Sequence, residues 1–66
     1  MVGLSSREER ILELLQEGEE LSVARLGELL GVSAVTIRAD LKSLELKGMV
    51  IRSRGTAIPA FHPQLL

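Results

Sequence analysis

The residues that could do chemistry in this chain are concentrated between Ser33 and Ser43, where small, polar and basic side chains recur at helical spacing. At about 100° per residue, one face of this helix carries Val35, Ala39, Lys42 and Ser43, flanked by Thr36 and Arg38. Such a face, with cations at its edge and no carboxylate near its centre, suits the major groove of B-DNA, where apolar atoms meet thymine methyl groups. The first-turn amides, from Ser33 through Ala34 to Thr36, would point at a phosphate. The pattern predicts contact with double-stranded DNA.

A second basic segment, formed by Arg52 and Arg54 beside Gly55 and Thr56, is predicted to contact the sugar-phosphate backbone. The two arginines fall on one face of a strand, and Gly55-Thr56 is typical of a type II′ hairpin turn with glycine first. Arginines at a hairpin tip supply position rather than base discrimination. In the alternative interpretation, these cations only protect a sheet edge from aggregation.

The charge of the chain is divided between its halves. Residues 1–30 hold three cations and seven anions, a net charge of −4, whereas residues 31–66 hold five cations and two anions, a net charge of +3. Such asymmetry indicates an end that faces a polyanion. It is also compatible with two solvated helix surfaces of different sign. A second class of function stays open too: Val35 and Ala39 could pack on a partner helix, in a protein-interaction module that does not bind DNA.

The elements that must position these residues begin with two helices. The first begins at Ser5 or Ser6, each of which has a glutamate three residues on, and ends at Gly18. The second begins after Ser22 and ends at Gly31. Their predicted inner faces are formed by aliphatic residues: Ile11, Leu12, Leu14, Leu15, Leu26, Leu29 and Leu30.

The third helix is predicted over residues 34–47, with Ser33 as its N-cap and with Ile37, Leu41 and Leu44 as its buried stripe. The short connection from Gly31 to Ser33 is typical of a helix-turn-helix. After Gly48 the pattern becomes β-branched and alternating, which predicts a hairpin that Pro59 ends. Residues 21–23 could add a strand to it.

The predicted fold is therefore mainly α with a small β-hairpin (α+β): a winged helix-turn-helix of three helices and a two- to three-stranded antiparallel wing. The domain is expected over residues 5–58, with the helix-turn-helix motif over residues 21–40, the recognition helix over residues 34–47 and the wing over residues 49–58.

Composition excludes several other classes. The chain has 66 residues, no cysteine and one histidine, His62, so neither a disulfide framework nor a structural zinc site is expected, and no cofactor is predicted. No apolar run approaches the roughly 20 residues of a membrane span and no signal peptide is recognisable, so no membrane partner and a cytoplasmic location are expected. Without paired carboxylates in an evident cleft, a phosphate-binding loop or an activated nucleophile, the chain is predicted not to be an enzyme.

Five segments carry a resemblance to a known family: Ser6-Arg7-Glu8-Glu9-Arg10-Ile11, Leu26…Leu29-Leu30-Gly31-Val32-Ser33, Thr36-Ile37-Arg38-Ala39-Asp40-Leu41, Leu44…Gly48 and Arg52-Ser53-Arg54-Gly55-Thr56-Ala57. Together they resemble the DNA-binding domain of the DeoR-type bacterial repressors of sugar and nucleoside catabolism, over roughly residues 5–58. The family usually has a second arginine at the position of Ala39 and a second glycine at that of Thr56. These two departures concern the base preference and the wing turn, not the fold.

The resemblance implies a regulator larger than this chain. Family members carry a sugar-phosphate-binding domain after the wing, which 66 residues cannot hold. Residues 59–66 are accordingly expected to be a linker or a truncated junction to a missing effector domain, the alternative being a solitary DNA-binding domain. One short helix and one wing bury little DNA surface, so the intact protein is expected to be a homo-oligomer that binds two half-sites.

Overall fold

The computed structural model describes residues 3–18 and 20–60, and its first element is α1 (Ser6–Gly18). Ser5 precedes this helix, and its Oγ accepts the amide N–H of Glu8 at 3.0 Å. The Ser5 amide in turn donates to Glu8 Oε1 at 2.9 Å. These two hydrogen bonds make the capping box that the sequence predicts, and they select Ser5 rather than Ser6 as the N-cap.

Two further helices form the predicted helix-turn-helix: α2 (Val23–Leu30) and α3 (Ala34–Leu46). Their N-caps are the predicted serines, Ser22 and Ser33, whose Oγ atoms accept the amides three residues on at 3.0 and 3.2 Å. Gly31 has a φ of 70°, the left-handed conformation that lets the chain leave one helix and enter the next within three residues. α3 ends one residue before its predicted limit.

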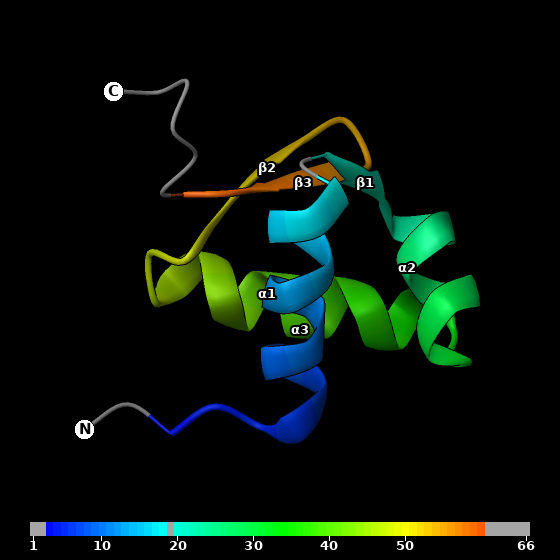
Figure 1. Ribbon diagram of the computed structural model, residues 1–66, viewed down its shortest axis with the longest axis horizontal. Helices are drawn as coiled ribbons and strands as arrows, with labels where there is room; N and C mark the ends of the chain where they lie inside the picture. The colour runs from blue at the N-terminus through cyan, green and yellow to red at the C-terminus, as the bar shows by residue number, and fades with distance from the viewer. Residues whose placement is uncertain (1–2, 19, 61–66) are drawn as a thin grey trace.

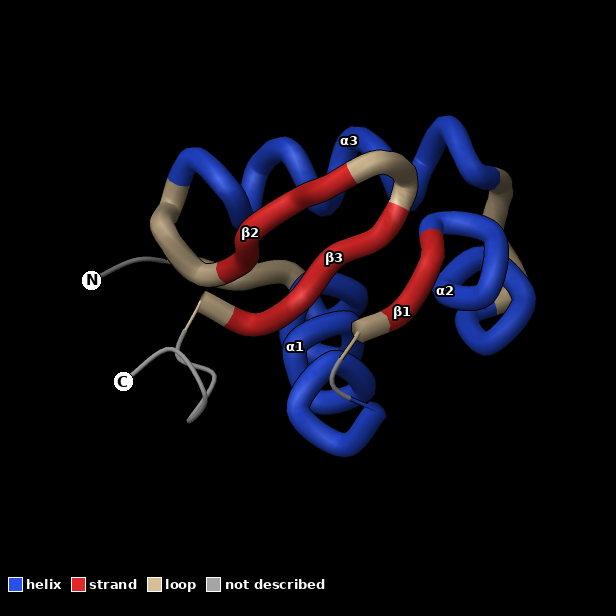
Figure 2. The backbone as a smooth tube through the Cα atoms, turned by 90° about the horizontal axis from the view of Figure 1, so that it is seen from above, coloured by secondary structure: helices blue, strands red, loops and turns tan. Residues whose placement is uncertain are grey.

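Three short strands form one antiparallel sheet in the order β1-β3-β2 (Figure 2). The strands are β1 (Leu21–Ser22), β2 (Val50–Ser53) and β3 (Thr56–Pro59). β1 leads directly into α2, so the segment between α1 and α2 supplies the third strand that the sequence left open. The helix-turn-helix is thereby joined to the hairpin through backbone pairing as well as through side chains.

The hairpin turn differs from the prediction in position and in type. Its two central residues are Arg54 and Gly55, not Gly55 and Thr56, because Ser53 pairs directly with Thr56. Arg54 has a φ of 45° and Gly55 a φ of 80°. Positive φ at both central residues is the signature of a type I′ turn, whereas type II′ needs it only at the first. Arg54 is therefore at the tip and not on the strand face with Arg52.

β3 ends at Pro59, as the sequence predicts, but Pro59 is itself paired opposite Val50, so the strand extends one residue beyond the predicted wing. The amide of Ala60 still donates to the carbonyl of Met49 at 3.0 Å. Hydrogen-bonded and non-hydrogen-bonded pairs alternate along an antiparallel ladder, so the Val50–Pro59 pair needs no amide from Pro59. The sequence predicts a linker over residues 59–66. Of these residues, Pro59 belongs to β3, Ala60 follows it, and residues 61–66 lie outside the described part of the chain.

The core lies where α1 crosses α3 against the sheet (Figure 1). It contains the predicted stripe of α3 together with residues of α1, α2, β2 and β3. Its members are Ile11, Leu15, Val23, Leu26, Ile37, Leu41, Leu44, Val50 and Ala57. Leu12, Leu14 and Leu30 pack against it half-buried. Leu29 was predicted to face inward but is 44% exposed, because α2 buries Val23, Leu26 and Gly27 at helical spacing and Leu29 lies off that stripe.

Gly27 lets α2 and the turn after it approach closely. A Cβ at this position would lie 2.8 Å from the carbonyl oxygen of Val32, a distance that side chains do not tolerate. The sequence does not reveal this role of Gly27, because the contact is made across the turn and not within the helix. No helix among the described residues is long and apolar enough to cross a membrane.

Candidate nucleic-acid interface

α3 presents one exposed side whose centre carries no acidic residue, with Glu45 exposed at its edge near Arg38. Val35 is 73% exposed, and Arg38, Ala39 and Lys42 are exposed on the same helix, as the sequence predicts. Leu46, at the end of the helix, is 80% exposed and was not among the predicted site residues. The helical repeat puts Leu46 on the same side as Ala39 and Lys42, so the exposed face runs along the full helix.

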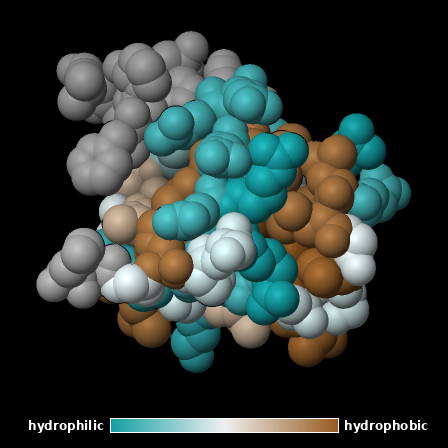
Figure 3. Space-filling model, turned by 60° about the horizontal axis from the view of Figure 1, so that its bottom comes forward, coloured by the Kyte–Doolittle hydropathy of each residue, from teal (hydrophilic) through white to brown (hydrophobic). Residues whose placement is uncertain are grey.

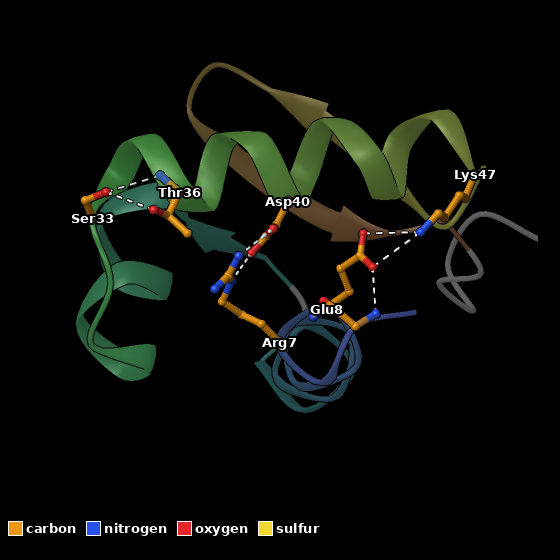
Figure 4. A network of polar contacts seen from close by, with 7 residues as sticks. Arg7, Glu8, Ser33, Thr36, Asp40 and Lys47 are labelled. Carbon is orange, nitrogen blue, oxygen red and sulfur yellow. Dashed lines mark hydrogen bonds and ion pairs between the residues drawn. The ribbon is translucent and has the colours of Figure 1, made fainter. Parts of the chain in front are cut away.

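The N-terminus of α3 has a defined polar arrangement. Ser33 Oγ accepts the Thr36 amide and lies 3.1 Å from Thr36 Oγ1, so both hydroxyls are engaged in the cap (Figure 4). The amides of Ala34 and Val35 have no acceptor among the described residues, as is usual for the first turn of a helix. Ser33 is exposed, Thr36 and Ala34 are half-buried, and Ala34 packs against the core. This terminus offers two amide donors and a partial positive charge.

Two predicted site residues are turned into the fold instead. Ser43 is half-buried and lies close enough to Glu8 on α1 for its hydroxyl to help lower the pKa of that carboxyl, so it does not lie at the centre of the exposed face. Thr56 Oγ1 lies 2.8 Å from Glu20 Oε2 and 2.7 Å from the carbonyl oxygen of Ser53. Both hydroxyls therefore stabilise junctions between elements.

The hairpin tip lies toward the N-terminal half of α3 (Figures 1 and 2). Arg54 and Gly55 are exposed there, and the carbonyl of Gly55 accepts the amide of Val23 at 2.8 Å, which fixes the tip against the start of α2. Arg52 is half-buried on β2, and its Nη1 lies 3.8 Å from Glu45 Oε1 on α3. Arg54 is thus the wing cation best placed to meet a ligand.

Two ion pairs that the sequence does not predict join α1 to α3 and to its C-cap Lys47 (Figure 4). Arg7 holds Asp40 with two nitrogens: Nη2 donates to Oδ1 at 3.1 Å, and Nε donates to Oδ2. Lys47 Nζ lies 3.3 Å from both carboxylate oxygens of Glu8. The sequence does contain a pattern that could have indicated these pairs. Arg7 and Glu8 are adjacent and opposite in charge, and Asp40 and Lys47 carry the complementary charges in the predicted third helix.

These contacts perturb two titrations. The hydrogen bond to Asp40, followed by the charge of that carboxylate, raises the pKa of Arg7. The backbone N–H of Ser5, the hydroxyl of Ser43 and the ammonium of Lys47 lower the pKa of Glu8 from 4.5 to about 2. At neutral pH, Glu8 is therefore an ionised carboxylate that is buried between α1 and α3.

The ion pairs divide the cations of the chain into those with a carboxylate partner and those without one among the described residues. Five of them, Arg7, Arg10, Arg25, Lys47 and Arg52, lie within 4.0 Å of a carboxylate. Arg38, Lys42 and Arg54 have no such partner among residues 3–18 and 20–60. All three belong to the exposed side of α3 or to the hairpin tip, so the positive charge that remains unneutralised is gathered where the sequence predicts an interface.

The large exposed hydrophobic side chains of the described residues are spread over three elements. The large ones, Leu29, Val35, Leu46 and Ile51, come from α2, from α3 and from β2. On the face that Figure 3 shows, hydrophilic side chains form a band between separate groups of hydrophobic ones. Among the described residues, no group of three or more His, Cys, Asp or Glu side chains could hold a metal ion.

A helix-turn-helix with an exposed third helix, followed by a hairpin that is tied back to its second helix, defines the winged helix-turn-helix class of DNA-binding domains. Residues 7–60 match the DeoR-like helix-turn-helix domain. The chain belongs to this family, and it is a DNA-binding domain of the helix-turn-helix type that regulates transcription.

Curated relatives agree with the family match. The chain is 44% identical over 55 residues to the HTH-type transcriptional regulator GlpR of Haloferax volcanii. The matched segment covers 83% of this chain and 22% of the relative. It is 41% identical over 58 residues (88% and 22%) to a protein named as a candidate aga operon transcriptional repressor in Escherichia coli O157:H7. It is 38% identical over 52 residues (79% and 20%) to the HTH-type transcriptional regulator GolR of Listeria innocua.

The chain thus spans about a fifth of the length of the curated relatives it matches. By name, these relatives are transcriptional regulators. No solved structure matched the chain significantly.

Proposed function

We propose that this domain reads a specific duplex DNA sequence, with α3 in the major groove and the hairpin tip on the adjacent sugar-phosphate backbone. The observation that carries the proposal is that Arg38, Lys42 and Arg54, the cations without a carboxylate partner among the described residues, all lie on α3 or at the tip. Of the other five cations, Arg52 on β2 is paired with Glu45 on α3, and the remaining four have carboxylate partners on α1, α2 or α3. A surface selected only for solubility would have no reason to separate its charges in this way.

Each part of the interface has its own role in this proposal. Val35 and Ala39 present apolar atoms to base edges, and Lys42 and Arg38 contact bases or phosphates at the margins of the groove. The amides of Ala34 and Val35 bind a phosphate, in a terminus that Ser33 and Thr36 shape. Arg54 and Gly55 contact the backbone at the wing. Arg52 joins them only if it leaves Glu45, while Ser43 and Thr56 act by holding elements in place.

The wider assignment concerns the intact regulator, of which residues 5–58 form the DNA-binding domain. We infer a repressor of sugar or nucleoside metabolism genes, with a sugar-phosphate effector bound by a further domain and two DNA-binding domains per homodimer. What supports this is the family and the length of the named relatives, about four times that of this chain. A regulator of this kind acts where the chromosome lies, which supports a cytoplasmic location.

The test is selection of bound sites by this chain from a randomised duplex library, followed by affinity measurements over a range of salt concentrations. With about 3–5 phosphate contacts per domain, the logarithm of the affinity should fall against the logarithm of the salt concentration with a slope of roughly −3 to −4.5. Half-sites about one helical turn apart are expected for a dimeric version. An affinity that does not change with salt, or an unselected pool, would reject the proposal.

A protein-interaction module is the second candidate, favoured by the exposure of Val35 and Leu46 on α3. In that case Val35→Lys would abolish partner binding, and the chain would show no preference among duplexes. For a DNA-binding helix, Val35→Lys changes base preference but keeps the affinity for duplex DNA in general.

A further inference from the structure

The Arg7–Asp40 ion pair is the most directional contact between α1 and the recognition helix. Asp40 is 13% exposed, and the Arg7 guanidinium meets it with two nitrogens (Figure 4). A two-nitrogen contact with a carboxylate constrains angle as well as distance. Asp40 is the residue after Ala39, about 100° further around the helix. A contact that fixes the direction of the Asp40 side chain therefore also fixes the direction in which the exposed face of α3 points.

The apolar core alone constrains the placement of α3 less strictly. Ile37, Leu41 and Leu44 are fully buried against α1 and the sheet, but hydrophobic burial has no preferred direction. Aliphatic side chains of similar volume tolerate small shifts and rotations of a helix before much stability is lost. A shift of about one ångström, unimportant for the core, would displace every side chain on the exposed face relative to a base pair.

The second ion pair makes the arrangement specific for one register. Adjacent residues of α1, Arg7 and Glu8, meet Asp40 of α3 and its C-cap Lys47, seven residues on, and the signs are opposite in each pair. Seven residues correspond to about 10.5 Å along a helix. A slide of α3 by one turn separates both pairs, and a slide that brings Lys47 to Arg7 places like charges together. Buried and half-buried charges are best attested in this role of fixing a register.

We propose that Arg7 and Asp40 are positioning residues for DNA recognition: their ion pair, with Glu8–Lys47 as its second point of attachment, sets the rotation and axial register of α3, so that base discrimination depends on α1. The proposal rests on the proposed function for its DNA readout. It assigns Arg7 no contact with DNA, although its side chain is 43% exposed.

The first test compares discrimination, not affinity alone. A mismatched base pair lowers the affinity of an ordinary site-specific protein about tenfold. In Asp40→Asn and in Arg7→Gln, we expect this ratio to fall to about twofold, while the slope of affinity against salt stays within about 0.5 of the original. Arg10→Gln is the matched control, because it removes the same charge from α1 but only the exposed pair with Glu13. It should leave the ratio unchanged.

The exchange Arg7→Asp with Asp40→Arg decides between positioning and direct contact. It restores the pair with its polarity reversed, so we expect it to recover most of the tenfold discrimination. If Arg7 instead contacts a phosphate, the exchange will not rescue binding, and the salt slope of Arg7→Gln will be lower by about 0.9. Either of these results overturns the proposal, as does unchanged discrimination in Asp40→Asn.

A second measurement requires no DNA, and it keeps the proposal testable if the chain selects no duplex. Nuclear magnetic resonance spectra of Asp40→Asn should show broadened or shifted amide signals along α3, with nuclear Overhauser contacts between α1 and α3 altered or weakened. Arg10→Gln should show none of this. If α3 keeps its contacts to α1 in Asp40→Asn, the core alone sets the register and the inference is wrong. Failure to select DNA by the unmodified chain would reject the proposed function separately.

Discussion

Glu45 Oε1 on α3 lies 3.8 Å from Arg52 Nη1 on β2, so the cation of this wing strand is already paired with a carboxylate of the recognition helix. We expect Glu45→Gln to tighten duplex binding, because it removes a carboxylate from the edge of the interface and releases Arg52 for a phosphate. Affinity should rise about three- to tenfold at low salt, and the slope against salt should steepen by about 0.9. Glu13→Gln, which changes the same charge on α1, is the control. An unchanged slope would mean that Arg52 does not reach the DNA.

Arg54 has an unfavourable backbone conformation at the hairpin tip. Its φ of 45° lies in the left-handed region, which costs an ordinary residue about 1–2 kcal/mol, and Asn-Gly is the favoured pair for a type I′ turn. Arg54→Asn should therefore raise the melting temperature by several degrees while weakening duplex binding and lowering the salt slope by about 0.9. Thermal melting and a salt titration on the same preparation check both parts. A more stable variant that binds equally well would remove Arg54 from the interface.

Ala39 stands on the exposed face of α3 where the family usually has arginine. Ala39→Arg places a planar group of donors where it can meet O6 and N7 of guanine, a contact that discriminates by about 1–3 kcal/mol. We expect tighter binding to sites with guanine at the facing base pair and a nearly unchanged melting temperature. Affinities of both proteins for duplexes varied at one base pair test this. Unfolding of the variant would contradict the exposed placement of residue 39.

Gly27 should not accept a side chain. The Cβ of Gly27→Ala would lie 2.8 Å from the Val32 carbonyl oxygen, so α2 and the turn must separate, at a cost of about 1–3 kcal/mol. This outweighs the roughly 1 kcal/mol by which alanine favours a helix. Chemical denaturation measures the difference. Gly3→Ala is the control, since its Cβ meets nothing within 4 Å.

Glu8 should make stability depend on pH below neutrality. Its pKa is lowered from 4.5 to about 2 in the folded chain, so the unfolded chain binds more protons at intermediate pH. The stabilisation is therefore present above about pH 4.5 and is lost as the pH falls toward 2. Glu8→Gln should lower stability at pH 7 by about 1–3 kcal/mol. The gap between the two proteins should close on acidification, as thermal melting between pH 2 and 7 would show.

Features determined within a few residues could be predicted from the sequence. Ser22 and Ser33 cap helices because their hydroxyls meet amides three residues away, and Gly31 ends α2 by its own conformational freedom. The buried stripe of α3 likewise follows from helical periodicity. The exposed residues of the candidate interface follow from the same periodicity by exclusion.

Features that depend on how distant segments meet could not be predicted. Ser43 is half-buried near Glu8 of α1, and the periodicity of α3 does not contain the position of α1. The turn type at Arg54 follows from the strand register, in which Ser53 meets Thr56. Leu29 was assigned inward from its residue type, although an eight-residue helix has room for only one narrow stripe. The ion pairs of Arg7 and Lys47 join positions more than thirty residues apart.

The pairing of β1 with β3 makes the helix-turn-helix and the wing a single body. Leu21 and Ser22 pair with Ala57 and Thr56, and the Val23 amide is bonded to Gly55. The spacing between the groove-reading face and the tip is thus established during folding, and little conformational entropy is left to lose when DNA binds. The domain consequently acts as a rigid gauge of the distance between a groove and its flanking backbone, and a duplex with a widened or narrowed groove should bind less well even when its bases are unchanged.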